Sequence, residues 1–302
     1  MRNQFIHDLV LRAESDDRIV LIVGDLGYGV VEPFAERFPD RFFNSGVAEQ
    51  NMMGLAAGLA SEGYHVFVYS IANFPIFRCA EQIRNDVCYH NLSVTVVAVG
   101  GGLAYGNLGY SHHAVQDYAF MRSLPNMKIL SPGDPNEVSH CLDHIFNNPG
   151  PSYLRLGKAG EDNFSSKSSQ LKSGIFNPIR ILNDSKSAVI VTGAICQDVM
   201  SYYFKSNEID FDILTCPIWG MDEKSKIEMQ LSQYSRIVTV EDHLVDAGFG
   251  SWVLEGLESS SRSKLRIVGL SSEVCGMVGS QSLLNHKGGI SKANIDKFLQ
   301  EK

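Results

Sequence analysis

The sequence lacks the features that mark nucleic-acid-binding, membrane-spanning and disulfide-stabilised proteins. Its 26 Lys and Arg residues are outnumbered by 34 acidic residues and form no dense basic cluster that would attract nucleic acid or an anionic membrane. No apolar run is long enough to span a bilayer, and the first residues lack the apolar core of a signal peptide. The six cysteines form no CxxC pair, so neither a zinc site nor a disulfide framework is indicated. We therefore expect a cytoplasmic protein with buried free thiols and no nucleic-acid or membrane partner.

The remaining composition is that of a soluble globular protein, and the length of 302 residues favours two domains. Apolar, β-branched runs at 18–24, 64–71 and 92–99 lack strict polar alternation, as expected of parallel strands buried on both faces. Helix-length stretches at 47–62 and 74–90 lie between them. This alternation predicts a doubly wound α/β fold.

A second α/β unit follows a polar connection. Residues 159–174 are rich in Ser, Gly and charge, which is typical of an exposed link between domains. Short apolar runs resume at 188–192, 211–216, 237–241 and 265–270. We predict a first domain at 1–160, a linker at 161–185 and a second doubly wound domain at 186–302.

One carboxylate stands at a predicted helix start. The sequence Asn-Ser-Gly-Val-Ala-Glu-Gln ends with Glu49 and Gln50 and opens a helix rich in small residues, which permits close packing at an interface. The stretch 44–112 resembles the pyrimidine-binding domain of transketolases and of the related deoxyxylulose-phosphate synthases, and weaker similarity covers almost the whole chain. The resemblance implies that Glu49 hydrogen-bonds the aminopyrimidine of thiamine diphosphate and stabilises the tautomer that activates the cofactor. Such proton sharing needs a carboxyl group removed from solvent.

Two aromatic residues follow Glu49 in the pattern of the family. Phe74 lies twenty-five residues after Glu49, and Phe77 follows one helical turn later. The resemblance implies that these residues bind the aminopyrimidine ring, and we select Phe77 for the stacking contact, which adds on the order of 1 kcal/mol beyond burial. A third aromatic residue of the family pocket aligns with Ala80, so part of the pocket must be filled differently.

A histidine pair follows a glycine-rich segment after the strand at 92–99. His112 stands where the family places the histidine that faces the reacting carbon, and we expect it to bind substrate hydroxyls and transfer protons. His113 replaces a family glutamine and is a weaker substrate-binding candidate. The position fits, because open α/β sheets bind ligands beyond the carboxyl ends of their strands.

The diphosphate-binding half of the family is missing from the sequence. Transketolases bind the cofactor diphosphate and Mg²⁺ through a Gly-Asp-Gly motif followed by Asn, which this chain does not contain. The run 133–137 (Gly-Asp-Pro-Asn-Glu) reads instead as a helix start. We expect no metal ligand in this chain, and a partner subunit of the N-terminal transketolase type that holds Mg²⁺, with two copies of each chain.

Several substrate positions depart from the family pattern. In the family, an aspartate binds a hydroxyl group of the donor substrate, and this position aligns with Leu108. The family histidine that binds the donor phosphate aligns with Gly100. Arg2 and Lys158 fall near the phosphate-binding arginines, although lysine cannot form a bidentate fork. These differences predict a sugar or sugar-phosphate substrate that is modified, shortened or differently phosphorylated.

In the second half, the sequence Val-Thr-Val-Glu-Asp at 238–242, followed by Gly-Phe-Gly-Ser at 248–251, resembles a strand, acidic turn and helix start of the transketolase C-terminal domain. We expect a structural role for it.

Three functions stay open. The first is a transketolase subunit that transfers a two-carbon ketol unit from a ketose to an aldose. The second is a beta-type subunit of a 2-oxo acid dehydrogenase, or a deoxyxylulose-phosphate-synthase-like enzyme. The third is a non-catalytic assembly subunit, which fold alone does not exclude. The Ala-Glu-Gln and Ser-His-His-Ala sequences fit the first function better than the second. The joint presence of Glu49, Phe77 and His112 argues against the third, because an assembly subunit needs none of them.

Overall fold

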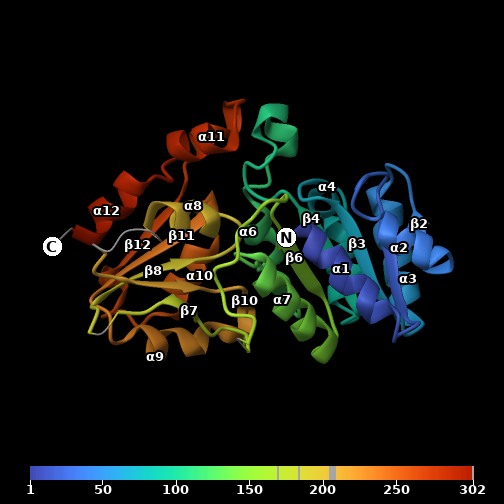
Figure 1. The fold of residues 1–302 in the computed structure, drawn as a ribbon, viewed down its shortest axis with the longest axis horizontal. Coiled ribbons are helices and arrows are strands. Elements are labelled where there is room, and N and C mark those ends of the chain that lie inside the picture. The colour runs from blue at the N-terminus through green and yellow to red at the C-terminus, as the bar shows by residue number, and fades with distance from the viewer. Residues whose placement is uncertain (169, 183, 204–208, 301–302) are drawn as a thin grey trace.

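Two β-sheets, each flanked by helices, organise the chain (Figure 1). A computed structural model describes residues 1–168, 170–182, 184–203 and 209–300. The first sheet has seven strands in the order β10-β5-β6-β4-β3-β1-β2, and the second has five in the order β12-β11-β8-β9-β7. Neighbouring strands are parallel except β10 against β5 and β7 against β9. Both sheets therefore have the predicted α/β architecture.

The first sheet contains the three strands expected from the apolar runs, namely β1 Ile19–Val23, β3 His65–Ile71 and β4 Val94–Val99. It also contains β2 Phe42–Asn44, β5 Lys128–Leu130 and β6 Ser152–Leu156. Side chains alternate between two cores, so that Val20 and Ile22 point to one face and Leu21 and Val23 to the other. Because both faces are covered, the strands need no polar alternation.

Helices cover both faces of this sheet. α1 (Arg2–Ala13), α2 (Glu32–Arg37) and α7 (Pro135–Asn147) pack on one face, and α3 (Glu49–Ser61) packs on the other. The single helix predicted at 74–90 is wrong. It is divided into α4 (Phe74–Phe77), α5 (Ala80–Gln82) and a π-helical stretch (Ile83–Cys88), because Cys79 leaves helical geometry with φ −112° and ψ 17°. After the loop that follows β4, the short helix α6 spans Asp117–Met121.

The second sheet is built from the C-terminal half. Its strands are β7 Asn177–Arg180, β8 Ser187–Val191, β9 Asp212–Thr215, β11 Arg236–Leu244 and β12 Leu265–Leu270. Its helices are α8 Cys196–Tyr203, α9 Ile227–Leu231, α10 Phe249–Gly256, α11 Gln281–Gly288 and α12 Lys292–Gln300. Among the described helices, none is long and apolar enough to cross a membrane.

The two halves are interlocked. β10 (Ile218–Gly220) comes from the second half but pairs with β5 of the first sheet, and β7 lies inside the segment predicted as a linker. At the junction Arg155 of β6, only 2% exposed, pairs with the carboxylates of Asp117 and Asp242. One hydrophobic core continues from the first sheet to Trp219 and Trp252. The domain boundaries remain a prediction.

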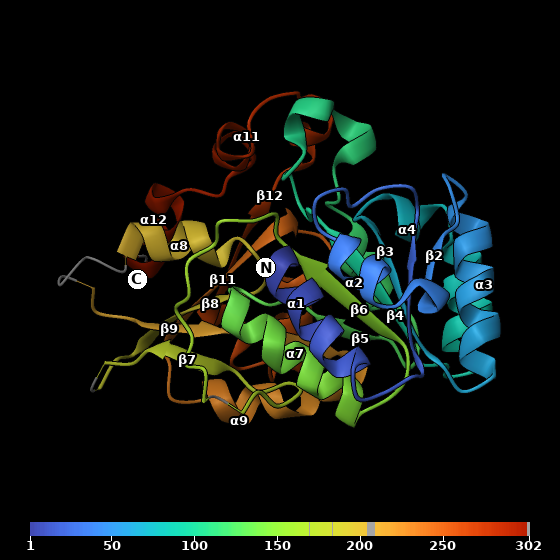
Figure 2. The ribbon, with the colours of Figure 1, turned by 45° about the vertical axis from the view of Figure 1, so that its right-hand side comes forward.

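A loop of the first half meets a loop of the second half beside α11 (Figures 1 and 2). Two turns of 3₁₀ helix, Gly106–Leu108 and Tyr110–His112, form the first of these loops. The backbone N–H of Gly279 donates to the carbonyl of Gly106 at 3.2 Å. The segment that carries His112 is thus supported by the C-terminal half.

Candidate active site

Three loops at the carboxyl ends of parallel strands bring the predicted catalytic residues together. They are residues 45–48 after β2, 72–78 around the start of α4 after β3, and 100–116 after β4. Because these strands run parallel, their following loops lie on one edge of the sheet. This edge is where ligands bind in open α/β sheets.

Glu49 is the first residue of α3, and its side chain is only 4% exposed. The N-terminal end of a helix favours a negative charge at this position. Oε1 of Glu49 accepts a hydrogen bond from Nη1 of Arg78 at 2.7 Å, within an ion pair. A hollow of about 550 Å³ opens beside the pair and is also lined by Val47, Ala48, Gln50 and Asn51. The buried carboxylate therefore borders a space that a ligand can enter.

Arg78 connects Glu49 to the aromatic residues. Its guanidinium carbon lies 4.4 Å from the centroid of the Phe74 ring. The Phe74 ring in turn meets the ring of His112 edge-on, with centroids 5.1 Å apart. Glu49, Arg78, Phe74 and His112 thus form one row of contacts, which we call the catalytic row after the predicted catalytic residues Glu49 and His112. Sequence reasoning missed Arg78, although its place four residues after Phe74, about one helical turn, was a usable signal.

Phe77 lies at the end of α4 and is 42% exposed. The contacts with Arg78 and His112 are made by Phe74. The structure therefore brings Phe74 into the catalytic row and leaves Phe77 beside it, free to contact another molecule. Which of the two rings stacks on a cofactor remains a prediction.

His112 is held by its neighbours on the loop after β4. Its Nδ1 atom lies 3.0 Å from Oγ of Ser111, and the Ser111 carbonyl accepts a hydrogen bond from Nδ2 of Asn73 at 2.7 Å. Among the described residues, Nε2 of His112 has no hydrogen-bond partner. One ring nitrogen is therefore oriented while the other can exchange a proton with a substrate.

His113 and Leu108 have opposite environments. His113 is 1% exposed, with Nε2 3.5 Å from the carbonyl of Gly106, and burial lowers its pKa. It therefore supports the loop from inside as a neutral side chain. Leu108 is 57% exposed on the same loop. A ligand at this edge can reach Leu108 more easily than His113.

Lys158 lies shortly after the end of β6, and Arg2 is the first residue of α1. Nζ of Lys158 lies 4.5 Å from the centroid of the Tyr105 ring. Partial burial and the positive charge of Arg2 both lower the pKa of Lys158. The structure therefore places one of the two predicted substrate-binding cations, Lys158, over the ring of Tyr105.

The acidic pair Glu241 and Asp242 lies within β11 and not in the turn that the resemblance implied, but Glu241 has the expected structural role at a helix start. Glu241 accepts hydrogen bonds from the backbone N–H groups of Phe249 at 2.6 Å and Gly250 at 2.8 Å, at the start of α10. Burial raises the pKa of Glu241 to about 8. The run at 133–137 also starts a helix, since the Asp134 side chain accepts from the Glu137 N–H at 2.8 Å. The Glu241 and Asp134 carboxylates therefore each accept hydrogen bonds from backbone N–H groups at the start of a helix.

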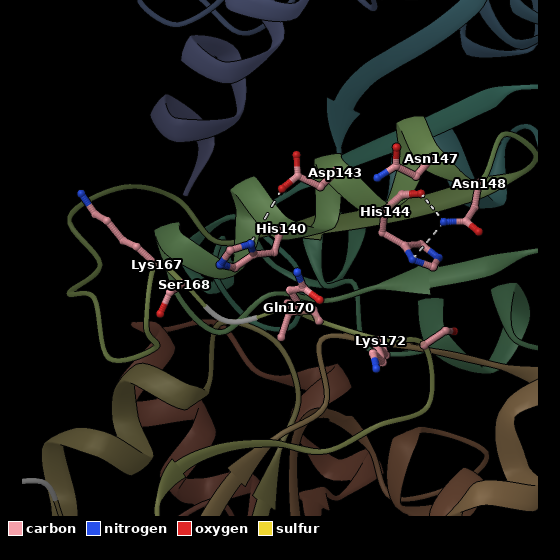
Figure 3. Close-up of a pocket in the computed structure, with 11 residues that line it drawn as sticks. His140, Asp143, His144, Asn147, Asn148, Lys167, Ser168, Gln170 and Lys172 are labelled. Atoms are coloured by element: carbon pink, nitrogen blue, oxygen red, sulfur yellow. Dashed lines mark hydrogen bonds and ion pairs between the residues drawn. The ribbon is translucent and has the colours of Figure 1, made fainter.

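A larger hollow of about 660 Å³ runs along α7, on the face of the sheet opposite α3 (Figure 3). Some of its polar side chains contact one another or the backbone. Nδ2 of Asn148 donates to the His144 carbonyl at 3.0 Å, and Nδ1 of His140 lies 3.8 Å from Asp143. Although this hollow is larger than the one beside Glu49, it contains no residue of the catalytic row.

Comparison with known proteins assigns the family. Residues 1–160 match the family model described as the pyrimidine-binding domain of transketolase. The chain belongs to the transketolase family. A Methanocaldococcus jannaschii protein provisionally named transketolase C-terminal section is 31% identical over 100% of this chain and 95% of its own length. One of the subunits of the apulose-4-phosphate transketolase of Phocaeicola vulgatus is 30% identical over 99% of this chain and 96% of its own.

A solved structure agrees with these sequences. A split-gene transketolase, described as an inactive beta4 tetramer, superposes with a TM-score of 0.84 and 29% identity, covering 99% of this chain and 97% of that one. These findings confirm the predicted fold class and the predicted assignment to a C-terminal transketolase subunit. The chain is a transferase subunit of the thiamine-diphosphate-dependent transketolase type.

Proposed function

We propose that this chain completes a split transketolase by supplying the cofactor-activating and substrate-binding residues, while a partner of the N-terminal type supplies the sites for diphosphate and Mg²⁺. The assembled enzyme would move a two-carbon ketol unit from a ketose to an aldose. The observation that carries this proposal is the catalytic row, which joins Glu49 to His112 through Arg78 and Phe74 at the ligand-binding edge of the sheet.

The residues at this edge fit the aminopyrimidine end of thiamine diphosphate. Glu49 presents a carboxylate to the hollow, and only its Oε1 atom is engaged by a described residue. Oε2 can therefore bind a ring nitrogen, while Phe74 and the half-exposed Phe77 offer apolar ring faces. When bound, the cofactor supplies an electron sink for carbon–carbon bond cleavage. Glu49 would hold the proton that is shared with the pyrimidine.

His112 and the two cations serve the substrate in this proposal. Nε2 of His112 donates to a developing alkoxide and later accepts the proton back, as an imidazole positioned at the reacting group can. Lys158 and Arg2 bind an anionic end of the sugar, and Leu108 lines the approach to His112. His113 acts on the substrate only through the loop that it supports.

The partner is inferred from the missing Gly-Asp-Gly motif and from the relatives. The Phocaeicola vulgatus relative is named as one subunit of its transketolase, and the similar solved structure is described as inactive when built of beta chains alone. Both descriptions support an active complex that contains a second kind of chain. We place two copies of each chain in that complex, and we place the complex in the cytoplasm.

The proposal is tested by isolating the native complex and screening it for ketol transfer with added thiamine diphosphate and Mg²⁺. Glu49→Gln should assemble normally but lose most activity, because an amide keeps the shape and cannot share the proton. Glu62→Gln, at the exposed end of α3, is the matched control and should stay active. Near-normal turnover of assembled Glu49→Gln would remove Glu49 from the mechanism.

A further inference from the structure

A buried arginine of β6, Arg155, contacts both ends of the loop after β4 that carries His112. Nη2 of Arg155 donates to the Ala114 carbonyl at 3.0 Å, and the same carbonyl accepts from the Gly102 N–H at 2.9 Å. At the start of the loop, a Cβ atom on Gly101 would collide with the Arg155 side chain. The guanidinium therefore lies between the two ends of the loop, and Ala114 is only two residues from His112.

The second half of the chain holds the same arginine and the same loop. Nη1 of Arg155 pairs with the carboxylate of Asp242 in β11, and Nη2 donates to the Asp242 backbone carbonyl at 3.2 Å. A Cβ atom on Gly102 would collide with this carboxylate. The N–H of Leu244, also in β11, donates to the Val115 carbonyl at 3.0 Å. The C-terminal half thus fixes the loop through an ion pair and a backbone hydrogen bond.

Arg155 has no N–H group left for a ligand. Its Nε atom donates to Asp117 at 2.6 Å, and its Nη1 atom also donates to the Tyr118 hydroxyl at 3.1 Å. Together with the contacts to Ala114 and Asp242, these bonds occupy all five N–H donors of a guanidinium. The side chain is 2% exposed, so a substrate or cofactor does not reach it. Arg155 can therefore act on a reaction only through the segments that it holds.

The charges around Arg155 do not balance, which argues against stability as its main purpose. One guanidinium faces two carboxylates, Asp117 and Asp242, whose side chains are both fully buried. Oδ2 of Asp242 is inaccessible to solvent and has no hydrogen-bond partner among the described residues. Buried ionic groups are often less stabilising than apolar residues of similar volume, because removing charges from water costs more than their attraction returns. A planar and fully bonded guanidinium does provide a fixed geometry.

We propose that Arg155 is a positioning residue, which together with Asp242 holds the loop after β4 so that Nε2 of His112 reaches the substrate. This inference rests on the proposed function, because it names a residue that the assigned role of His112 requires. Ser111 orients the imidazole locally through the 3.0 Å contact with Nδ1, whereas Arg155 sets the position of the whole segment. A displacement of about 1 Å at a reacting group can slow a reaction about a hundredfold.

The inference is tested in the assembled complex with Arg155→Lys, which keeps the charge but cannot bind three segments at once. The variant should lower kcat for ketol transfer about tenfold to a hundredfold, while KM for the ketose stays within about twofold. In a His112→Ala background the same substitution should lower kcat no further, because the residue through which it acts is gone. Equal losses with and without His112 would overturn the proposal.

The matched control is Glu137→Gln, which alters another buried group between the two halves. The hydrogen-bond partners of Glu137 are Gly133, Asn177 and Thr215, and none of them belongs to the loop after β4. This variant should leave kcat unchanged. A loss of kcat in Glu137→Gln as large as that in Arg155→Lys would show a general effect of the junction and would also overturn the proposal.

The His112 ring gives a second readout, which needs no ketol transfer. In the full chain with isotope-labelled histidine, the NMR signal that disappears in His112→Ala should shift or broaden in Arg155→Lys and stay in place in Glu137→Gln. If Arg155→Lys does not fold, Asp242→Asn takes its place, since the amide keeps the shape and an acceptor oxygen but removes the ion pair. An unmoved His112 signal in the folded variant would contradict the positioning role. A complex without ketol transfer whose His112 signal still responds would reject the proposed function and leave the positioning role standing.

Discussion

The carboxylate of Glu49 and the guanidinium of Arg78 form an ion pair in which Oε1 and Nη1 are 2.7 Å apart. The two partners differ in environment, since the Glu49 side chain is 4% exposed and the Arg78 side chain is 49% exposed. A buried carboxylate without a cation loses much of its hydration. Arg78 therefore provides the ion-pair partner of the buried Glu49 carboxylate in the chain without its partner subunit.

Replacing Arg78 should destabilise the folded chain through Glu49. Arg78→Met should lower the free energy of unfolding at neutral pH by about 1 kcal/mol, which is the value of a charged hydrogen bond reduced by solvent screening of the exposed arginine. In the background of Glu49→Gln the same substitution should cost less, and this coupling is measured by a double-mutant cycle in urea. Arg84→Met, at another exposed arginine of the same segment, is the control. Equal costs in both backgrounds would mean that the pair contributes no stability.

The isolated chain should bind thiamine diphosphate weakly or not at all. The sequence lacks the Gly-Asp-Gly motif, so the diphosphate and Mg²⁺ have no dedicated ligands here. Calorimetric titration of the single chain with Mg²⁺ present measures this directly, and adding the partner chain should restore binding. Tight binding by the purified single chain would contradict the division of the cofactor site between two subunits.

Stability should depend on pH through Glu137, a buried carboxyl that connects the two halves. Its oxygens accept from the Gly133 N–H at 2.7 Å and from Nδ2 of Asn177 at 2.8 Å, and the Thr215 hydroxyl also contacts it. Burial raises the pKa of Glu137 from its ordinary 4.5 to about 7. In the pH range between these values the folded chain holds a proton that the unfolded chain releases.

The contribution of Glu137 to the free energy of unfolding should therefore be highest below about pH 4.5, and it should be lost as the pH rises through about 7. The full change is on the order of 3 kcal/mol. Urea unfolding of the wild type and of Glu137→Gln across this range isolates the contribution, since Glu241 titrates in both proteins. If the free energies of unfolding of the wild type and of Glu137→Gln changed in parallel with pH, the pKa of Glu137 would be the same in the folded and the unfolded chain.

Leu108 should shift donor preference away from that of ordinary transketolases. Its exposed side chain cannot bind a sugar hydroxyl, and each buried hydrogen bond lost costs roughly 1–3 kcal/mol, or about one to two decades in kcat/KM. The assembled complex should be assayed with xylulose 5-phosphate and with unphosphorylated or deoxygenated ketoses, before and after Leu108→Asp. A wild type that already prefers xylulose 5-phosphate with ordinary efficiency, and gains nothing from Leu108→Asp, would contradict the argument.

Much of the fold was predictable from local patterns. Apolar runs without polar alternation marked the parallel strands, because strands covered on both faces need no polar side. The helix starts at Asp134 and Glu49 were also visible, since capping and helix-dipole effects act over one turn. Helix ends were less predictable, as the break at Cys79 shows.

The sequence by itself determined the α/β class, the resemblance to transketolases and the candidate residues Glu49, Phe74 and His112. Only the tertiary structure decided that Arg78 connects these residues in one row and that Tyr105 lies on Gly100 under Lys158. It also decided that β10 crosses to the first sheet. The physical reason is range: strand and helix patterns reflect neighbours within a few positions, whereas ion pairs, ring contacts and strand exchange join segments that become neighbours only when the chain folds.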